Sequence, residues 1–497
     1  MIARCFHPRL FLTFALAFSA AAGDLSRAED APAPRPASTP IADRYRETAE
    51  RIAAATMSGN DGYRKLEELC TTIGHRLSGS PQLERAIDWA VATMKKDGQE
   101  NCRREKVMVP HWIRGRESAE MLEPRFEELH ILGLGGSVGT PPEGVTAPVL
   151  VVHDEEELNA LGDGARGKIV LFNKAMPSYN PEHGSGYGTA VKYRTQGASL
   201  ASAKGGVAAL VRSATAASLR SAHTGAMRYR EAEKPIPSAA ISLEDVELIA
   251  RLQQLGKPVV VNLKMEGKTL PDAESGNVIG ELRGSERPDE VVVIGGHIDS
   301  WDVGQGAHDD GGGIVMAMEA INVLRQAKLI PRRTIRVVLW TNEENGLAGG
   351  KAYAKDHADE LSNHIAAVET DSGVFEPRGY GVSCSDSERE TSAVEQMADI
   401  MSLFAPESSP TLSSISSSMT AHKGGGGADI GPMKNAGVVL IGHNVEGSRY
   451  FDYHHSHADT IDKVDPKAMS QNVAALATVA YILADMPERF GQAAPKP

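Results

Sequence analysis

Strand-like and helix-like segments alternate from about residue 276 to residue 485. The strand segment 290–294 is almost entirely apolar, which is typical of a strand with both faces buried. We therefore expect an α/β fold of three layers, helix, sheet and helix, around a mostly parallel sheet. The expected strands are 290–294, 334–340, 365–369 and 438–441, and the expected helices are 313–328, 347–361 and 465–483.

Side chains of the metal-ligand type follow three of these strands. His297 and Asp299 follow the first strand, Glu343 and Glu344 the second, and Asp371 the third. In a sheet of this kind the ligand site forms at the carboxyl ends of the strands. We therefore expect these side chains to gather at one site.

Two loops add further candidates, which are Asp309, Asp310, His454, His455 and His457. Imidazole and carboxylate groups without a thiolate suit zinc or a similar divalent cation. One shared carboxylate, with one histidine and one more carboxylate for each ion, gives a two-metal site. Such a site can activate water and stabilise the oxygen that becomes negative during attack.

Four motifs in this order resemble those of the co-catalytic dizinc aminopeptidase family. They are Gly-His-Ile-Asp-Ser-Trp-Asp-Val-Gly-Gln-Gly-Ala-His-Asp-Asp-Gly-Gly-Gly at 296–313, Leu-Trp-Thr-Asn-Glu-Glu at 339–344, Glu-Thr-Asp-Ser-Gly at 369–373 and His-His-Ser-His-Ala-Asp-Thr at 454–460. The resemblance covers residues 276–485 and implies a zinc-exopeptidase catalytic domain with two Zn²⁺ per chain.

The resemblance also implies a role for each matching residue. One zinc ion would be bound by His297, Asp309 and Asp371, and the other by Asp309, Glu344 and His455. Asp309 would bridge the two ions.

Glu343, beside a glutamate ligand, would be the general base that takes a proton from water and passes it to the leaving amine. Asp299 would accept the second imidazole N–H of His297 and fix its tautomer. Asp310 follows the bridging ligand, where a local backbone role is as plausible as a role in binding.

The assignment of His455 has competitors in His454 and His457. The family motif aligns His455 with Asp459 and Thr460, and for this reason we choose it.

The function implied is a zinc-dependent exopeptidase or dipeptidase that hydrolyses short unblocked peptides. Alternatives are a broad aminopeptidase, a catalytically silent receptor-like relative, and an amidohydrolase or cyclase that uses the same site on another acyl donor. Relatives suggest a homodimer. The net charge is −13, and the sequence has no cluster of basic residues that would indicate a nucleic-acid-binding face.

Residues 140–270 have a different pattern, with short apolar strands separated by glycines. We expect strands at 149–152, 167–172, 206–211 and 259–263 and a helix at 243–255. The patterns at 167–170 and 236–241 resemble the protease-associated domain. We therefore expect a β-rich α/β domain at 140–270, inserted between catalytic-domain segments 41–139 and 271–487.

The N-terminus has a basic start, an apolar run from Leu10 to Ala22 and a small-residue exit. This pattern predicts a signal peptide at 1–23, followed by a flexible linker at 24–40. The protein would then be exported, to the periplasm or outside the cell, with no membrane association after cleavage. A flexible tail is expected at 488–497.

Three cysteines, Cys70, Cys102 and Cys384, follow the predicted signal peptide. Export permits a disulfide between Cys70 and Cys102, but their spacing does not decide it. The composition of the Ser/Gly-rich stretch 408–427 favours a mobile loop. Such a loop either lines or covers the substrate pocket or is a disordered surface loop without a role in the site. Ala428-Asp429-Ile430 follows it, where many relatives of the family have Ser-Asp-His.

Overall fold

The computed structural model describes residues 40–492, apart from residue 232. The predicted signal peptide and nearly all of the linker lie outside these residues. Within them, Cys70, Cys102 and Cys384 are free thiols. Among the described helices, none is long and apolar enough to cross a bilayer.

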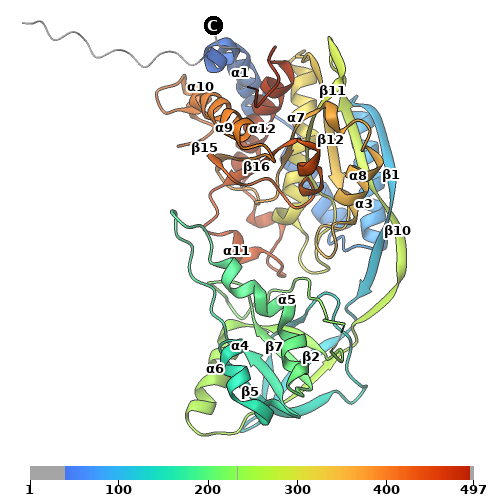
Figure 1. The fold of residues 1–497 in the computed structure, drawn as a ribbon, viewed down its shortest axis with the longest axis vertical. Coiled ribbons are helices and arrows are strands. Elements are labelled where there is room, and N and C mark those ends of the chain that lie inside the picture. Colours follow the sequence, from blue (N-terminus) through green and yellow to red (C-terminus); the bar gives the residue numbers. More distant parts are fainter. Residues whose placement is uncertain (1–39, 232, 493–497) are drawn as a thin grey trace, which may run out of the picture. The chain divides into compact units, whose positions relative to one another are not determined.

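The first sheet has eight strands and carries the predicted catalytic residues (Figure 1). In spatial order the strands are β1 (Glu100–Ile113), β10 (Lys268–Leu282), β12 (Arg333–Trp340), β11 (Arg287–His297), β13 (His364–Glu369), β16 (Val439–Val445), β14 (Pro377–Ser383) and β15 (Thr420–Lys423). The four central strands β12, β11, β13 and β16 are parallel. The expected α/β architecture around a mostly parallel core is confirmed.

Alternate residues of the central strands bury their side chains in two cores. Val292 and Ile294 of β11 belong to one core, and Val291 and Val293 belong to the other. Burial on both faces of the sheet explains why residues 291–294 are all apolar. The first core packs against α1 (Pro40–Ser58), α2 (Gly62–Glu68), α3 (Pro81–Lys96), α7 (Gly312–Gln326), α9 (Ser387–Met401) and α12 (Pro466–Asp485). The second core packs against α8 (Ala348–Asp356).

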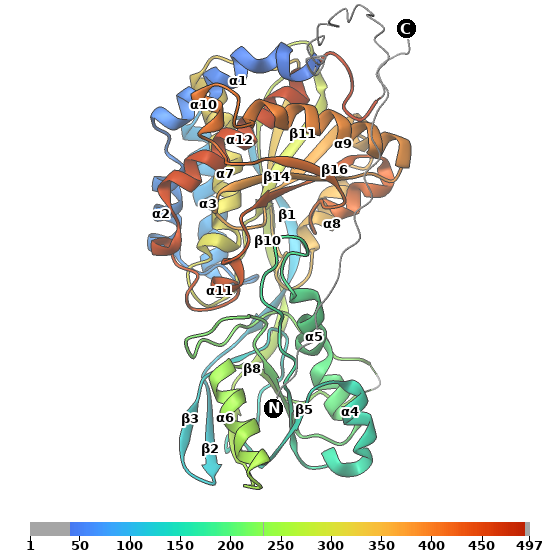
Figure 2. The same ribbon diagram turned by 90° about the vertical axis from the view of Figure 1, so that its left-hand side faces the viewer.

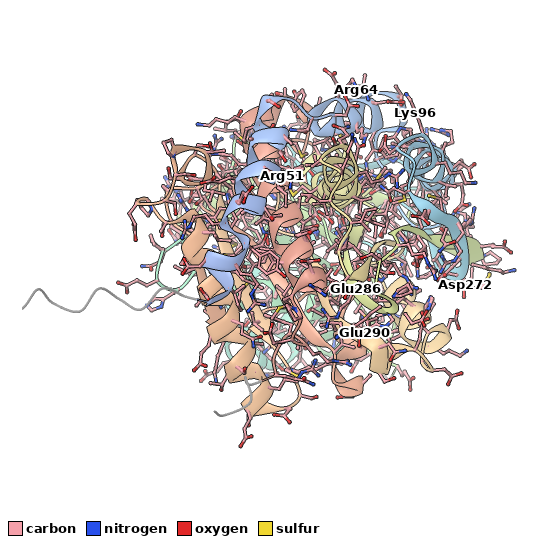
Figure 3. The ribbon with its side chains drawn as sticks, turned by 90° about the horizontal axis from the view of Figure 1, so that it is seen from above. Arg51, Arg64, Lys96, Asp272, Glu286 and Glu290 are labelled. Atoms are coloured by element: carbon pink, nitrogen blue, oxygen red, sulfur yellow. The ribbon has the colours of Figure 1, made fainter. Side chains whose placement is uncertain are left out.

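Local sequence signals explain several helix boundaries. The side chain of Ser80 caps α3, with Pro81 as its first residue, and Asp465 caps α12 in the same way. Helix α8 is shorter than expected and ends at Asp356. Seen from above in Figure 3, the exposed side chains of Arg51 and Arg64 project from the outer surface of the helical layer.

The second sheet also has eight strands and spans residues 117–265, which we call the 117–265 lobe (Figure 2). Its strands in spatial order are β3 (Glu127–Leu129), β2 (Glu117–Glu123), β9 (Val260–Met265), β5 (Val145–Val152), β6 (Ile169–Phe172), β7 (Ala208–Arg212), β8 (Ser238–Ile241) and β4 (Ile131–Gly133). Helix α6 (Leu243–Gln254) packs on one face, and α4 (Glu155–Ala160) and α5 (Tyr187–Ala203) on the other.

The stretch 408–427 differs from the mobile loop that its composition predicts. It contains the short helix α10 (Pro410–Ser413) and the edge strand β15, which pairs in parallel with β14. Leu412 and Ile415 are fully buried in the first core. Two apolar anchors and a strand partner therefore order a segment whose serines and glycines suggest a loop.

Candidate active site

The ends of three neighbouring strands bring the first predicted residues to one edge of the sheet. β11 pairs in parallel with β12 and β13, and its last residue, His297, is opposite Trp340, the last residue of β12. Glu343 and Glu344 follow β12, and Asp371 follows β13. Parallel pairing in register therefore delivers histidine, glutamate and aspartate to the same place.

His297, Asp309 and Asp371 form a first cluster. Nε2 of His297 lies 3.2 Å from Oδ1 of Asp309 and 3.6 Å from Oδ1 of Asp371. One ligand atom from each residue lies within 4.8 Å of the other two. The side chain of Asp371 is 28% exposed while that of His297 is 1% exposed, so this cluster opens to solvent beside Asp371.

Asp309, Glu344 and His455 form a second cluster. Nε2 of His455 lies 3.3 Å from Oδ2 of Asp309 and 3.0 Å from Oε2 of Glu344. The two oxygens of Asp309 therefore face different histidines, Oδ1 toward His297 and Oδ2 toward His455.

The competing histidines lie elsewhere or farther away. The ring of His454 stacks on that of His455 with 3.5 Å between centroids, and its Nε2 lies 3.8 Å from Oδ2 of Asp309. His454, His455 and Asp309 also offer three ligand atoms within 4.8 Å of one another. His457 is exposed and lines a separate cavity. His455 is thus the histidine in contact with both Asp309 and Glu344.

The donor set fits a divalent cation. Oδ2 of Asp309 and Oδ1 of Asp371 are buried and have no hydrogen-bond partner among the described residues. Burial and the neighbouring carboxylate of Asp309 raise the pKa of Glu344 to about 7, which reflects an excess of buried negative charge. A cation such as zinc would give these oxygens a partner and offset that charge.

Asp299 connects the ends of β11 and β12. Its main-chain oxygen lies 3.1 Å from Nδ1 of His297, nearer than its carboxylate at 3.6 Å. The carboxylate accepts hydrogen bonds from the main-chain N–H groups of Glu343, at 3.1 Å, and Glu344, at 3.3 Å. The imidazole is therefore oriented mainly by the backbone, and the side chain of Asp299 holds the Glu343–Glu344 turn.

Two more aspartates bind main-chain N–H groups at or beside the candidate ligands His297 and Asp309. Asp310 accepts a hydrogen bond from the main-chain N–H of His297 at 3.0 Å, which is a local backbone contact. Asp459 accepts hydrogen bonds from the main-chain N–H groups of His308, at 2.7 Å, and Asp309, at 3.1 Å. Sequence reasoning used Asp459 only to align the last motif and missed this contact.

A cavity of about 780 Å³ lies beside the first cluster and includes Asp371 in its wall. Tyr179 and Ser185 of the 117–265 lobe line it, together with Tyr450 and His422. Part of the stretch 408–427 therefore does line the space next to the candidate ligands, although in an ordered conformation.

Comparisons with known proteins show which family the chain resembles. The sequence model described as peptidase family M28 matches residues 277–480. Carboxypeptidase Q of Bos taurus is 42% identical over 447 residues, covering 89% of this chain and 90% of that protein. Carboxypeptidase Q of Homo sapiens is 43% identical and covers 88% of each chain.

Solved structures extend the likeness to the whole fold. The crystal structure of a peptidase M28 precursor from Shewanella amazonensis has a TM-score of 0.84 at 35% identity, covering 91% of this chain and all of that one. A zinc aminopeptidase from Bacillus subtilis has a TM-score of 0.60 at 19% identity, covering 85% and 94%, and shares the fold.

The fold and the site together define a metallopeptidase. The chain belongs to peptidase family M28, with the carboxypeptidase Q proteins as relatives over most of its length.

Proposed function

We propose that the chain is a zinc-dependent exopeptidase that hydrolyses short unblocked peptides and binds two Zn²⁺. The observation that carries this proposal is the position of Asp309, whose two oxygens face two different histidines. We assign His297, Asp309 and Asp371 to one ion, and Asp309, Glu344 and His455 to the other. The orphaned oxygens of Asp309 and Asp371 support this assignment.

Glu343 is the proposed general base. Bound zinc supplies Lewis-acid chemistry, which polarises the scissile carbonyl and makes water a better nucleophile. Glu343 takes the proton of the attacking water and passes it to the leaving amine. Burial, with the neighbouring carboxylates of Asp371 and Glu344, raises the pKa of Glu343 well above its ordinary value.

The cavity beside Asp371 is the proposed substrate site. Its volume of about 780 Å³ is within the usual range of small-ligand pockets and suits a short peptide. Tyr450 and Asp371 in its wall would bring the scissile bond to the exposed side of the first cluster. Asp299, through the main-chain N–H of Glu343, keeps the proposed base at this edge.

Hydrolysis of unblocked dipeptides tests the proposal. We expect Glu343→Gln to lower kcat by roughly 10²- to 10⁴-fold while zinc content stays at the wild-type level. Glu286→Gln is the matched control, because Glu286 is 53% exposed and pairs with Arg332. Wild-type turnover in Glu343→Gln would exclude this base.

Acetylated and amidated forms of the same peptides separate the alternatives. A dipeptidase requires both termini free, so acetylated and amidated forms should both fail, whereas a broad aminopeptidase cleaves amidated peptides. A catalytically silent relative cleaves none of these peptides, with or without added zinc.

We further propose that the protein is exported after removal of residues 1–23. The basic start, the apolar run and the small-residue exit support this. N-terminal sequencing of the protein from its native host tests it, and a mature chain that still begins at Met1 would contradict it.

A further inference from the structure

The 117–265 lobe contacts the backbone that carries His455. The main-chain N–H of Thr224 donates to the main-chain oxygen of His455 at 2.9 Å. In return, Nδ1 of His455 lies 3.3 Å from the main-chain oxygen of Thr224. Beside this pair, Nδ1 of His223 lies 2.7 Å from the main-chain oxygen of His454. These three polar contacts join the ligand loop to the lobe.

These contacts stabilise both the backbone conformation and the tautomer of His455. Its φ of +60° is a left-handed conformation that a non-glycine residue keeps only when its surroundings hold it there. In addition, an N–H at Nδ1 that donates to Thr224 leaves the lone pair of Nε2 free to face Asp309 and Glu344. Nη1 of Arg194 also lies 3.4 Å from Nδ1, but as a donor it suits the other tautomer. A cation bound at Nε2 would favour the tautomer in which Nδ1 donates to Thr224.

Arg114, in the connection between β1 and β2, holds Thr224 in place. Its Nε and Nη2 form a two-point ion pair with the carboxylate of Asp302, at 2.9 and 2.6 Å. Nη2 also donates to Oγ1 of Thr224 at 3.3 Å, and Nη1 donates to the main-chain oxygen of Gly133. The side chains of Arg114 and Asp302 are only 10% and 16% exposed, so this pair is weakly screened by solvent.

Asp302 also connects Arg114 to Glu344, another proposed ligand of the second cluster. It follows Trp301, whose main-chain N–H donates to Oε1 of Glu344 at 3.1 Å. Oε2 of the same carboxylate faces His455. One arginine therefore links the backbone that orients His455 with the loop that orients Glu344.

We infer that the 117–265 lobe is part of the second metal site, with Thr224 aiming His455 and Arg114 acting as a positioning residue for that site. The inference rests on the proposed two-zinc function. It predicts that loss of Arg114 weakens one zinc ion selectively, because the first cluster has no contact with Arg114 or Thr224 among those described here. Partners of this kind typically change metal affinity by about 10- to 100-fold.

Zn²⁺ titration of the full metal-free chain by calorimetry tests this directly. For Arg114→Met we expect one of two sites to weaken by about 10- to 100-fold and the other to stay within about twofold. Arg116→Met is the matched control, because Arg116 pairs with Glu266 and its side chain is 91% exposed. Thr224→Val is a milder variant, which loses only the Oγ1 contacts and decides the matter if Arg114→Met does not fold.

Double variants identify the weakened site. In a His455→Ala background, Arg114→Met should cause no further change, whereas in a His297→Ala background it should weaken the remaining site. Equal weakening of both ions, or wild-type affinities in Arg114→Met and Thr224→Val, would overturn the inference. A wild-type protein that binds fewer than two zinc ions would instead contradict the proposed function.

Discussion

The carboxylate of Asp459 accepts a hydrogen bond from the main-chain N–H of Asp309 at 3.1 Å, although 150 positions separate the two residues. Its other oxygen accepts from the N–H of His308 at 2.7 Å. Two hydrogen bonds to one carboxylate thus fix the backbone that leads into the proposed bridging ligand. The bridge is therefore positioned from the last motif of the chain as well as from the first.

Asp459→Asn should weaken zinc binding. An amide nitrogen cannot accept a hydrogen bond, so one of the two N–H groups loses its partner and Asp309 gains freedom. We expect zinc affinity to fall by about 10- to 100-fold, measured by dialysis against graded chelator. Asp462→Asn is the control, because Asp462 is 65% exposed. Equal zinc retention in both variants would show that Asp459 has no positioning role.

The central strands and helices of the catalytic sheet could be predicted because burial on both faces leaves a clear record in the sequence. Val291–Ile294 lies within β11. All four of its side chains are buried, which explains why the segment is apolar. β1 and β10 were not predicted, since charged side chains run along both strands. Lys106 of β1 and Glu274 of β10, for example, pair across the ladder at 66% and 57% exposure. Only tertiary pairing makes such segments strands.

The candidate ligands could also be predicted, because histidine, aspartate and glutamate are metal-binding residue types and they directly follow the predicted strands. The contact between Thr224 and His455 could not, since it uses a main-chain oxygen. Every residue has a main-chain oxygen, so the sequence does not show which one will accept a hydrogen bond from a ligand. Arg114 was equally hidden, because its role depends on Asp302, which lies 188 positions away in the chain.

Gly295→Ala should destabilise the fold. A Cβ at this position would lie 1.8 Å from the main-chain oxygen of Val338 on β12 and 2.8 Å from the ring of Trp340. The two strands would have to separate just before His297, so we expect the free energy of unfolding to fall by roughly 1–3 kcal/mol or more. Urea unfolding measures this.

Gly188→Ala is the matched control and should change stability in the opposite direction. A Cβ at Gly188 in α5 meets nothing within 4 Å. Alanine is a better helix former than glycine, so we expect a gain of up to about 1 kcal/mol. Equal effects of the two substitutions would mean that the close approach of β11 to β12 does not constrain residue 295.

A half-buried histidine, His357, should make stability depend on pH. Burial alone lowers the pKa of His357, but hydrogen bonds and charge from Glu105 and Glu360 outweigh it, so the pKa lies above its ordinary value of 6.5. Because the folded state binds the proton more tightly, this contribution is fully present below pH 6.5. It is lost as the pH rises through the folded-state pKa.

We therefore expect His357→Gln to flatten the fall in unfolding free energy between pH 6.5 and the alkaline range, measured by urea unfolding at a series of pH values. His153→Gln is the control, since His153 pairs with Glu157 at 63% side-chain exposure. An unchanged slope in His357→Gln would assign the pH dependence to other groups.

Arg76 is a fully buried guanidinium that bonds to main-chain oxygens. It donates to the carbonyls of Ile298 at 2.9 Å, Gly74 at 2.9 Å, Gln305 at 2.8 Å and Gly306 at 3.0 Å. Three of these carbonyls belong to the loop between His297 and Asp309. One side chain from the N-terminal part of the chain therefore fixes the path that connects two of the proposed ligands.

Arg76→Lys should lower both stability and zinc affinity, even though the charge is kept. A lysine ammonium has three donors and no planar fork, so it cannot reach four carbonyls spread around a guanidinium. Each carbonyl left without a donor costs roughly 1–3 kcal/mol, which urea unfolding of the metal-free protein would show. Zinc affinity should fall as well, because the loop between His297 and Asp309 loosens. Arg64→Lys, at 53% exposure, should change neither property. A stable Arg76→Lys protein with wild-type zinc affinity would mean that the loop holds its shape without this arginine.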